Sequence, residues 1–479
     1  MVKLYLVRIS GEVILKASKT RIRFEKRLVK NIIDMCRKHG IFNLKIEKSE
    51  ARIFIEGPEK LESILCKVFG IYSYSPVVKV DFSDLEDLSN KAKDYFKNKI
   101  VGKKFAVRVK RAGKHDFTSI DAARKIGSKL YKYSTGVNLK NPEVEVFVEI
   151  RNNHAFFFDK IIKGSGGLPI GVNGRAVSLF SGGFDSPVAS WFAWKRGVEL
   201  DFVYCYLGGL DAKYRTLKVL KTLVDNWCSG YTPKLHIVDF RPIVSDIIKN
   251  VKKELRQVIL RRAMYRAAEI IAREVQASAI VTGESLGQVS SQTLWNIAVA
   301  EEIVRIPILR PLIGLDKEEI INLARKIGTY ELSSKVREYC AIARGKVATR
   351  AKLSDVKMEE EKISSDVIED AAKRREIYNV FEINPIDFLP VENVAINFIP
   401  SEALLIDLRE REDFEKWHPP NAIHIEDLKI DSLPKDRVII AYCDSGILSS
   451  EFAASLRKKG FKAFSFEGGL SQLRYKACK

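Results

Sequence analysis

The stretch SLFSGGFDSPVAS, residues 178–190, sets two glycines, an aspartate and a serine directly after an apolar run. The apolar run is typical of a buried strand, and the residues after the glycines are typical of a helix that ends at Gly197. Ser186 is placed to cap that helix, and Pro187 suits its first turn. Such a junction presents free backbone N–H groups to an anion, so it predicts a phosphate site. No Gly-Lys-Ser/Thr sequence follows, which excludes a Walker A loop.

A cysteine near the end of the sequence has a similar setting. Cys443 follows the apolar run VIIAY and precedes a short loop and the helical pattern ILSSEFAASL. Successive N–H groups and a helix dipole directed at its sulfur stabilise a thiolate or an anionic persulfide. The pattern also allows a second interpretation, an inert thiol buried at the end of a strand.

The elements that position these residues fall into five segments. Four apolar runs alternate with helical periodicity over residues 172–345, which predicts a doubly wound parallel sheet. A ferredoxin-like α+β unit is expected over 1–69, and a second α+β unit over 70–169. A charged helical connector is expected over 346–399, followed by an α/β unit over 400–479. We therefore expect a multidomain protein of the α/β and α+β classes.

The composition indicates which binding partners and which cellular compartment to expect for the chain. The chain has 479 residues and a net charge of +20, which favours a polyanionic partner such as nucleic acid, although a basic surface can also serve solubility alone. We expect no signal peptide and no membrane span, and the seven cysteines have no metal-ligand spacing. These features indicate a cytoplasmic protein with mostly reduced thiols. Cys36, Cys66, Cys205 and Cys228 lie in apolar contexts and are expected in the core.

The SGGFDS sequence resembles the PP-loop signature SGGxDS of the ATP pyrophosphatases. The resemblance implies cleavage of ATP between its α and β phosphates and adenylation of a substrate oxygen. Asp185 is expected to hold Mg²⁺, because a bare carboxylate would repel the phosphates. Lys317 resembles a family lysine suited to phosphate or transition-state charge. The residues expected to bind ATP or pyrophosphate are Leu179, Phe180, Ser181, Gly182, Gly183, Asp185, Ser186, Arg261, Gly283 and Gln292.

Taken alone, the residue patterns leave alternatives for three of these side chains. Arg261 lies in a basic helix and could face solvent or RNA. Gln292 could be a surface residue, and Lys317 could be an ordinary lysine near a helix start capped by Asp316.

Longer stretches resemble the tRNA 4-thiouridine synthetase family of the ThiI type. They are RISGEVILKASKTRIRFEKRL, GSGGLPIGVNGRAVSLFSGGFDSPVAS, TGESLGQVSSQTL and RPLIGLDKEEII. The resemblance spans nearly the whole chain and implies a ferredoxin-like domain, a THUMP domain, a PP-loop domain and a rhodanese-like domain in that order. It also implies ATP and tRNA as substrates, with uridine 8 as the modified base, and a role in supplying sulfur for thiamine through a sulfur-carrier protein. A homodimer is a weaker expectation.

The same resemblance implies how sulfur travels. Cys443 is expected to carry a persulfide received from a cysteine desulfurase, and Cys340 to form a redox-active disulfide with it during turnover. The connector after Gly345 is expected to act as a hinge that brings the two together. The loop after Cys443 has Leu448 where sulfurtransferases often have arginine, which argues against free thiosulfate activity but not against relay from a protein donor.

The second segment resembles THUMP and is rich in cations. Such side chains would grip phosphates of the acceptor stem and the CCA end. The expected contacts are Arg108, Lys110, Arg111, Lys114 and Lys125. Each of them could instead belong to a solvated face.

Two rival functions remain open at this point. The first is a PP-loop enzyme that adenylates another acceptor, such as the C-terminus of a sulfur-carrier protein. The second is an RNA-binding chaperone with an inactive nucleotide site. The THUMP-like segment opposes the first as a sole role, and the intact SGGFDSP sequence opposes the second.

Overall fold

A computed structural model describes most of the chain. The described residues are 2–49, 51–209, 211–336, 348–389, 394–400, 402–430, 433–443 and 447–466. They divide into two units, Met1–Asn173 with Trp194–Gly197, and Gly174–Ala193 with Val198–Lys479. Cys340 and Cys478 lie outside the described residues. No described helix is both long enough and apolar enough to cross a bilayer.

The first unit contains one continuous sheet in the order β2-β3-β1-β4-β8-β7-β5-β6, with β9 on β4. Its strands and helices in chain order are β1 Val2–Ile9, α1 Gly11–Ile14, α2 Ser18–Lys38, β2 Lys45–Ser49, β3 Arg52–Pro58, α3 Leu61–Leu65, β4 Ile71–Asp81, α4 Leu85–Phe96, β5 Lys104–Ala112, α5 Ser119–Tyr131, β6 Gly136–Val137, β7 Val144–Arg151, β8 His154–Phe158 and β9 Ile162–Lys163. The first half of β4 pairs with β1 and its second half pairs with β8. This strand therefore belongs to both the ferredoxin-like part and the part after it.

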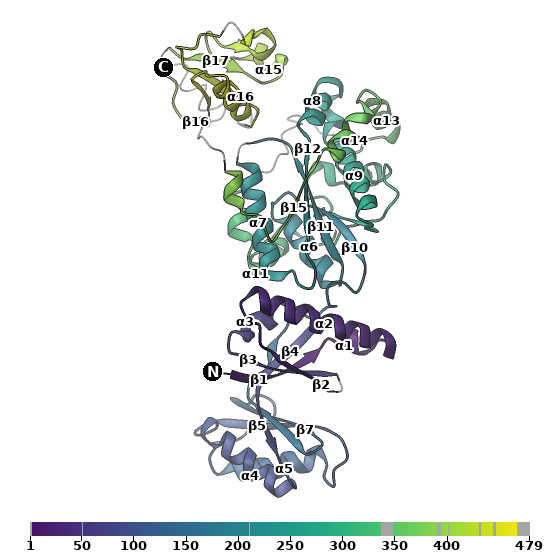
Figure 1. Ribbon diagram of the computed structural model, residues 1–479, viewed down its shortest axis with the longest axis vertical. Coiled ribbons are helices and arrows are strands. Elements are labelled where there is room, and N and C mark those ends of the chain that lie inside the picture. Colours follow the sequence, from purple (N-terminus) through teal and green to yellow (C-terminus); the bar gives the residue numbers. More distant parts are fainter. Residues whose placement is uncertain are drawn as a thin grey trace. The chain divides into compact units, whose positions relative to one another are not determined.

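Each half of this sheet has its own core. Helix α2 buries Phe24, Leu28 and Ile32 against strands of the ferredoxin-like half. In the other half, α4 and α5 lie together on β5 and β7, and bury Phe96 and Ile126 there (Figure 1). Apolar residues three and four apart on these helices produce the buried stripes.

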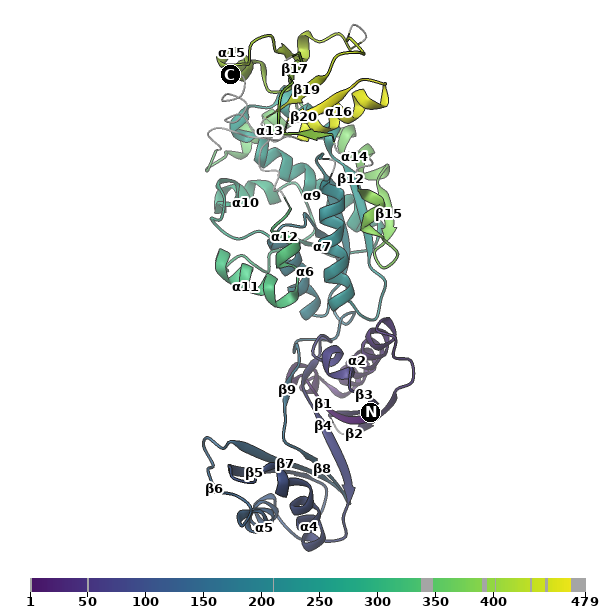
Figure 2. The ribbon, with the colours of Figure 1, turned by 90° about the vertical axis from the view of Figure 1, so that its left-hand side faces the viewer.

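The second unit is built on a sheet in the order β14-β13-β10-β11-β12-β15. All neighbours pair in parallel except β15, which is antiparallel to β12, so the predicted parallel sheet is confirmed. The elements are β10 Arg175–Leu179, α6 Asp185–Lys195, β11 Glu199–Tyr206, α7 Ala212–Trp227, β12 Lys234–Asp239, α8 Arg241–Asn250, α9 Arg256–Glu274, β13 Ile280–Val281, α10 Leu294–Glu301, β14 Ile308–Leu309, α11 Lys317–Ile327, α12 Tyr330–Ser333, α13 Leu353–Glu360, α14 Ser365–Lys373 and β15 Glu376–Asn379. Figure 2 shows α7 and α9 running alongside this sheet.

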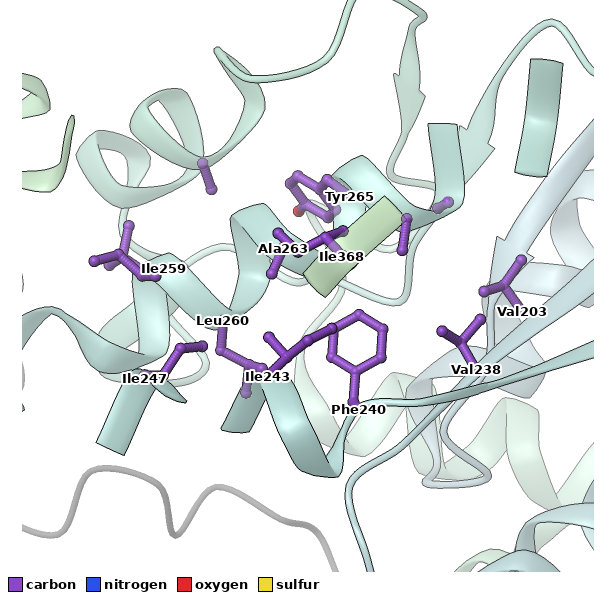
Figure 3. Packing of buried hydrophobic residues seen from close by; sticks show 14 of the residues in the cluster. Val203, Val238, Phe240, Ile243, Ile247, Ile259, Leu260, Ala263, Tyr265 and Ile368 are labelled. Carbon is purple, nitrogen blue, oxygen red and sulfur yellow. The ribbon is translucent and has the colours of Figure 1, made fainter. Parts of the chain in front are cut away.

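The segment expected to connect domains over 346–399 contributes to this α/β layer. Val356 of α13 and Ile368 of α14 are buried in the same core as α8 and α9. Figure 3 shows Ile368 between Ala263 and Tyr265, with Phe240 and Ile243 nearby. The sequence predicts a charged helical connector here, and the segment is helical, but Val356 and Ile368 attach its helices to the core. Residues after β15 also pack on this unit, because Val380 and Ile383 are buried and the ring of Phe388 contacts that of Tyr378.

The last sheet is entirely parallel, in the order β16-β20-β19-β17-β18. Its elements are β16 Ala395–Ile396, β17 Leu404–Asp407, α15 Arg411–Lys416, β18 Ile423–His424, β19 Ile439–Tyr442, α16 Ile447–Lys458 and β20 Ala463–Phe466. Apolar clusters cover both faces of the sheet, as expected for a parallel sheet buried on two sides.

Candidate active site

The SGGFDS turn joins β10 to α6, as the sequence predicts. Gly182 has φ +80°, and a Cβ there would lie 3.0 Å from the Cα of Thr216. Only glycine fits this close, left-handed position without strain. Ser186 does not precede the helix, because α6 already begins at Asp185. Its Oγ instead accepts hydrogen bonds from the backbone N–H of Ser181 at 3.1 Å and of Gly182 at 3.3 Å. The expected helix-capping role is therefore wrong, since the hydroxyl serves the turn.

A cavity of about 300 Å³ opens beside this turn. Every residue expected to bind ATP lines it except Gly182, which lies within the turn itself. The cavity lies where β10 and β11 end, which is the edge at which parallel sheets bind ligands. Cys205, expected only in the core, packs against that core and also lines the cavity. Burial raises the pKa of the Cys205 thiol, so it is a poor nucleophile.

Asp185 is the acidic centre of the cavity, with 17% of its side chain exposed. Its Oδ1 accepts a hydrogen bond from Lys317 Nζ at 3.2 Å, and its Oδ2 accepts one from Gln288 Nε2 at 3.1 Å. Lys317 is the first residue of α11, which Asp316 caps as predicted. A Cβ on Gly283 would lie 2.8 Å from the carbonyl carbon of Asp185, so the glycine permits this approach.

The residues at Asp185 fit a magnesium ion shared with substrate phosphates. Mg²⁺ is usually held by one or two carboxylates together with phosphate oxygens and water. The described residues contain no group of three or more His, Cys, Asp or Glu side chains that could hold a metal alone. Asp185 beside the turn can supply one carboxylate, and the phosphates of a nucleotide would have to supply the rest.

Arg261 is held in the cavity wall by a buried carboxylate, Glu284. Glu284 Oε1 accepts a hydrogen bond from Arg261 Nη1 at 2.7 Å, and its Oε2 accepts from Arg310 Nε at 2.7 Å and from Thr282 Oγ1 at 3.0 Å. Burial alone would raise the pKa of Glu284, but the charges of Arg261 and Arg310 outweigh it and hold that pKa below its ordinary value. Glu284 thus stays ionised and orients Arg261.

Sequence reasoning missed Glu284, Gln288 and Arg310. The first two belong to the stretch TGESLGQVSSQTL, in which only Gly283 and Gln292 were selected. A signal existed, because an acid and an amide in a loop after a predicted parallel strand lie at the ligand-binding edge of the sheet.

Removing the charge of Glu284 should weaken nucleotide binding more than catalysis. In Glu284→Gln we expect the KM for ATP to rise about tenfold, with kcat changed less than threefold, because Arg261 loses its charged anchor. Steady-state pyrophosphate release measures both constants. The matched control is Glu301→Gln, since Glu301 meets Arg310 at 2.7 Å but lines no part of the cavity. An unchanged KM in Glu284→Gln would contradict the anchoring role.

Cys443 lies immediately after β19 with 7% of its surface exposed. Its Sγ is 3.3 Å from Ser449 Oγ in α16. The residues between Cys443 and α16, whose N–H groups were expected to face the sulfur, lie outside the described residues, as does Cys340. The predicted Cys340–Cys443 pairing therefore stays a prediction.

The cationic side chains expected to bind RNA differ in the ion pairs and hydrogen bonds that they already make within the protein. Arg108 pairs with Glu145 at 3.2 Å, Lys125 pairs with Glu86 at 2.8 Å, and Arg111 contacts His115. Lys125 and Lys129 lower the pKa of Glu86 to about 2. Lys110 and Lys114 are exposed and make no ion pair with any described residue.

A second cavity, of about 740 Å³, lies between β5 and α5 of the same half. Arg108 and Lys110 line it together with Arg124, which sequence reasoning missed. Exposed apolar side chains, among them Tyr131 and Leu139, form much of the remaining wall. Cations beside apolar surface are suited to a nucleic acid strand, whose phosphates and bases need different contacts.

Four segments of the chain match known domain families. Residues 4–75 match the ThiI ferredoxin-like domain, 82–158 the THUMP domain, 171–365 the thiamine biosynthesis protein (ThiI) family and 395–475 the rhodanese-like domain. The predicted fold class is thereby confirmed. The fold and the cavity define a PP-loop nucleotide enzyme that carries RNA-binding and rhodanese-like domains.

Comparisons over the whole length of the chain define its family more narrowly. A tRNA sulfurtransferase of Desulfurococcus amylolyticus is 41% identical over 472 residues, which cover 98% of each chain, and one of Pyrobaculum aerophilum is 38% identical over 95% of each. A crystal structure of a 4-thiouridine synthetase–RNA complex with bound ATP is 31% identical, with TM-score 0.69, and the match covers 79% of this chain and 99% of that one. The chain belongs to the tRNA sulfurtransferase family, as the sequence motifs predict.

Proposed function

We propose that this chain is an ATP-dependent tRNA sulfurtransferase that replaces O4 of uridine 8 with sulfur. The observation that carries the proposal is the cavity beside the SGGFDS turn, which is lined by Asp185, the carboxylate that Lys317 contacts. Full-length relatedness to tRNA sulfurtransferases and likeness to an ATP-bound 4-thiouridine synthetase–RNA complex support it. A site of action in the cytoplasm is part of the proposal.

In the first half-reaction, uridine O4 attacks the α-phosphorus of ATP, the α–β bond breaks and pyrophosphate leaves. The N–H groups of the turn that do not donate to Ser186 Oγ receive the leaving pyrophosphate, and Lys317 neutralises developing negative charge. Arg261, oriented by Glu284, also lines the cavity and binds the nucleotide. Mg²⁺ held by Asp185 would supply further charge neutralisation on the phosphates.

In the second half-reaction, sulfur replaces the adenylated oxygen. The terminal sulfur of a Cys443 persulfide attacks C4 of the base, and AMP leaves with the oxygen. The Cys340 thiolate then attacks Cys443 Sγ, so that 4-thiouridine leaves and a Cys340–Cys443 disulfide forms. A dithiol reductant restores both thiols. A cysteine desulfurase loads Cys443, and the same persulfide could serve a sulfur-carrier protein for thiamine. A homodimer remains part of the proposal.

The affinity for tRNA should fall steeply with salt, because phosphate contacts release counterions. We expect the Kd to rise at least about tenfold between 50 and 200 mM KCl. Fluorescence anisotropy of labelled tRNA measures it. The double variant Lys110→Ala/Lys114→Ala should flatten the slope of log K against log salt by about two. Lys97→Ala is the control, since Asp94 already pairs with Lys97 at 3.2 Å. A flat salt dependence would mean that the basic excess is not the RNA-binding surface.

Nucleoside analysis of tRNA from a deletion strain tests the function as a whole. Loss of 4-thiouridine supports it. Unchanged thionucleosides would overturn it and favour adenylation of another acceptor.

A further inference from the structure

Three serine hydroxyls form a hydrogen-bonded chain that ends at the Cys443 sulfur. Ser449 Oγ lies 3.3 Å from Cys443 Sγ and 2.8 Å from Ser465 Oγ, and Ser450 Oγ donates to Ser465 Oγ at 3.2 Å. Ser449 and Ser450 belong to α16, whereas Ser465 belongs to β20. Ser449 and Ser465 are completely buried. Two separate elements therefore hold the hydroxyl that touches the sulfur.

The proton order along this chain is determined when the sulfur is anionic. Each serine has one proton to donate, and a thiolate can only accept. Because Ser450 donates to Ser465, the proton of Ser465 is free for Ser449, and the proton of Ser449 is free for the sulfur. All three donors then point the same way, and hydrogen bonds in such a series strengthen one another.

We propose that Ser449 is a catalytic residue of the sulfur-loading step, donating a hydrogen bond to the Cys443 thiolate, and that Ser465 positions it. The proposal rests on the persulfide role proposed for Cys443. In the loading step, the Cys443 thiolate attacks the terminal sulfur of a persulfide donor. The S–S bond of the donor breaks, its electron pair leaves on the donor thiolate, and Cys443 keeps the transferred sulfur. The hydroxyl donates to the attacking sulfur without bringing a second charge into the buried site.

The test is the pH dependence of Cys443 alkylation in the full-length, reduced protein. Iodoacetamide modification of the Cys443 peptide is followed by mass spectrometry between pH 5 and 10. In Ser449→Ala the midpoint should rise by about one pH unit, because a hydrogen bond to the anion is lost. Ser465→Ala should shift it the same way by less. Ser455→Ala, which removes an exposed hydroxyl from the same helix, should leave it unchanged.

Thermal unfolding of each variant establishes that the domain is folded. A wild-type midpoint in a folded Ser449→Ala protein would overturn the proposal. If Ser449→Ala does not fold, a wild-type midpoint in Ser465→Ala would overturn it instead. Loading of Cys443 from a small-molecule persulfide is measured in parallel. It tests whether Cys443 carries sulfur at all, separately from whether Ser449 donates to it. If wild-type Cys443 takes up no sulfur, the proposed persulfide role fails and the loading role of Ser449 fails with it, whereas a shifted midpoint combined with normal wild-type loading supports the serine chain.

Discussion

Asp185→Ala is expected to lower tRNA-dependent pyrophosphate release by at least about a hundredfold, while tRNA affinity stays within twofold of the wild type. Asp185 accepts hydrogen bonds from Lys317 and Gln288 beside the SGGFDS turn. Without the carboxylate, Lys317 loses its partner and the proposed Mg²⁺ would lose its protein ligand. The cations expected to bind RNA belong to the other unit of the chain, so they keep their charges and contacts.

The control for this experiment is Asp239→Ala. Asp239 is also an aspartate at the carboxyl end of a strand of the same sheet, but it pairs with Arg241 at 2.7 Å and does not line the cavity. Its replacement should leave pyrophosphate release unchanged. Full activity of Asp185→Ala would refute both the metal-binding role and the electrostatic role of this carboxylate.

Cys443 and Cys340 are expected to be equally necessary but at different steps. Cys443→Ala should carry no persulfide on the C-terminal domain and form no 4-thiouridine. Cys340→Ala should load Cys443 normally yet stop before multiple turnovers, because no thiol resolves the transfer. A single round in the wild type without reductant should leave a Cys340–Cys443 disulfide, detected as a cross-linked peptide by mass spectrometry. Its formation requires the two Cα atoms to come within about 7 Å.

Cys66→Ala is the matched control, because Cys66 is a half-buried thiol in the other unit and has no assigned role. It should load and turn over as the wild type does. Multiple turnovers by Cys340→Ala in the presence of reductant would show that Cys340 is not the resolving thiol.

Local patterns predicted the parts of the site that depend on neighbouring residues. The apolar run, the glycines and the helix pattern around Asp185 were sufficient for the strand–turn–helix junction, and Asp316 marked the start of α11. The contact between Asp185 and Lys317 joins residues 132 positions apart, so only the resemblance to a family suggested both residues. Whether Ser186 caps the helix or accepts hydrogen bonds from the turn depends on the residue at which α6 begins. That residue can shift by one position without any change in the sequence pattern.

Longer-range packing accounts for what sequence reasoning missed. In the sequence, Ile368 lies in a segment predicted to be a charged connector. Only its packing in the core that contains α8 and α9 explains its burial. The boundary expected between residues 69 and 70 falls just before β4, and only the two partners of this strand show that both halves of the sheet share it. Glu284 orients Arg261 through contacts with Arg261 and Arg310, and both arginines lie elsewhere in the sequence. Each of these depends on tertiary contacts that a periodic pattern does not contain.

The most direct test of the account is a complete reaction with purified protein. Unmodified tRNA transcript, ATP, Mg²⁺, a cysteine desulfurase with cysteine, and a dithiol reductant are combined, and 4-thiouridine and AMP are quantified together. The account predicts one AMP for each 4-thiouridine, thiolation confined to position 8, and no product without ATP. Formation of AMP without any thionucleoside, or thiolation that proceeds without ATP, would contradict it.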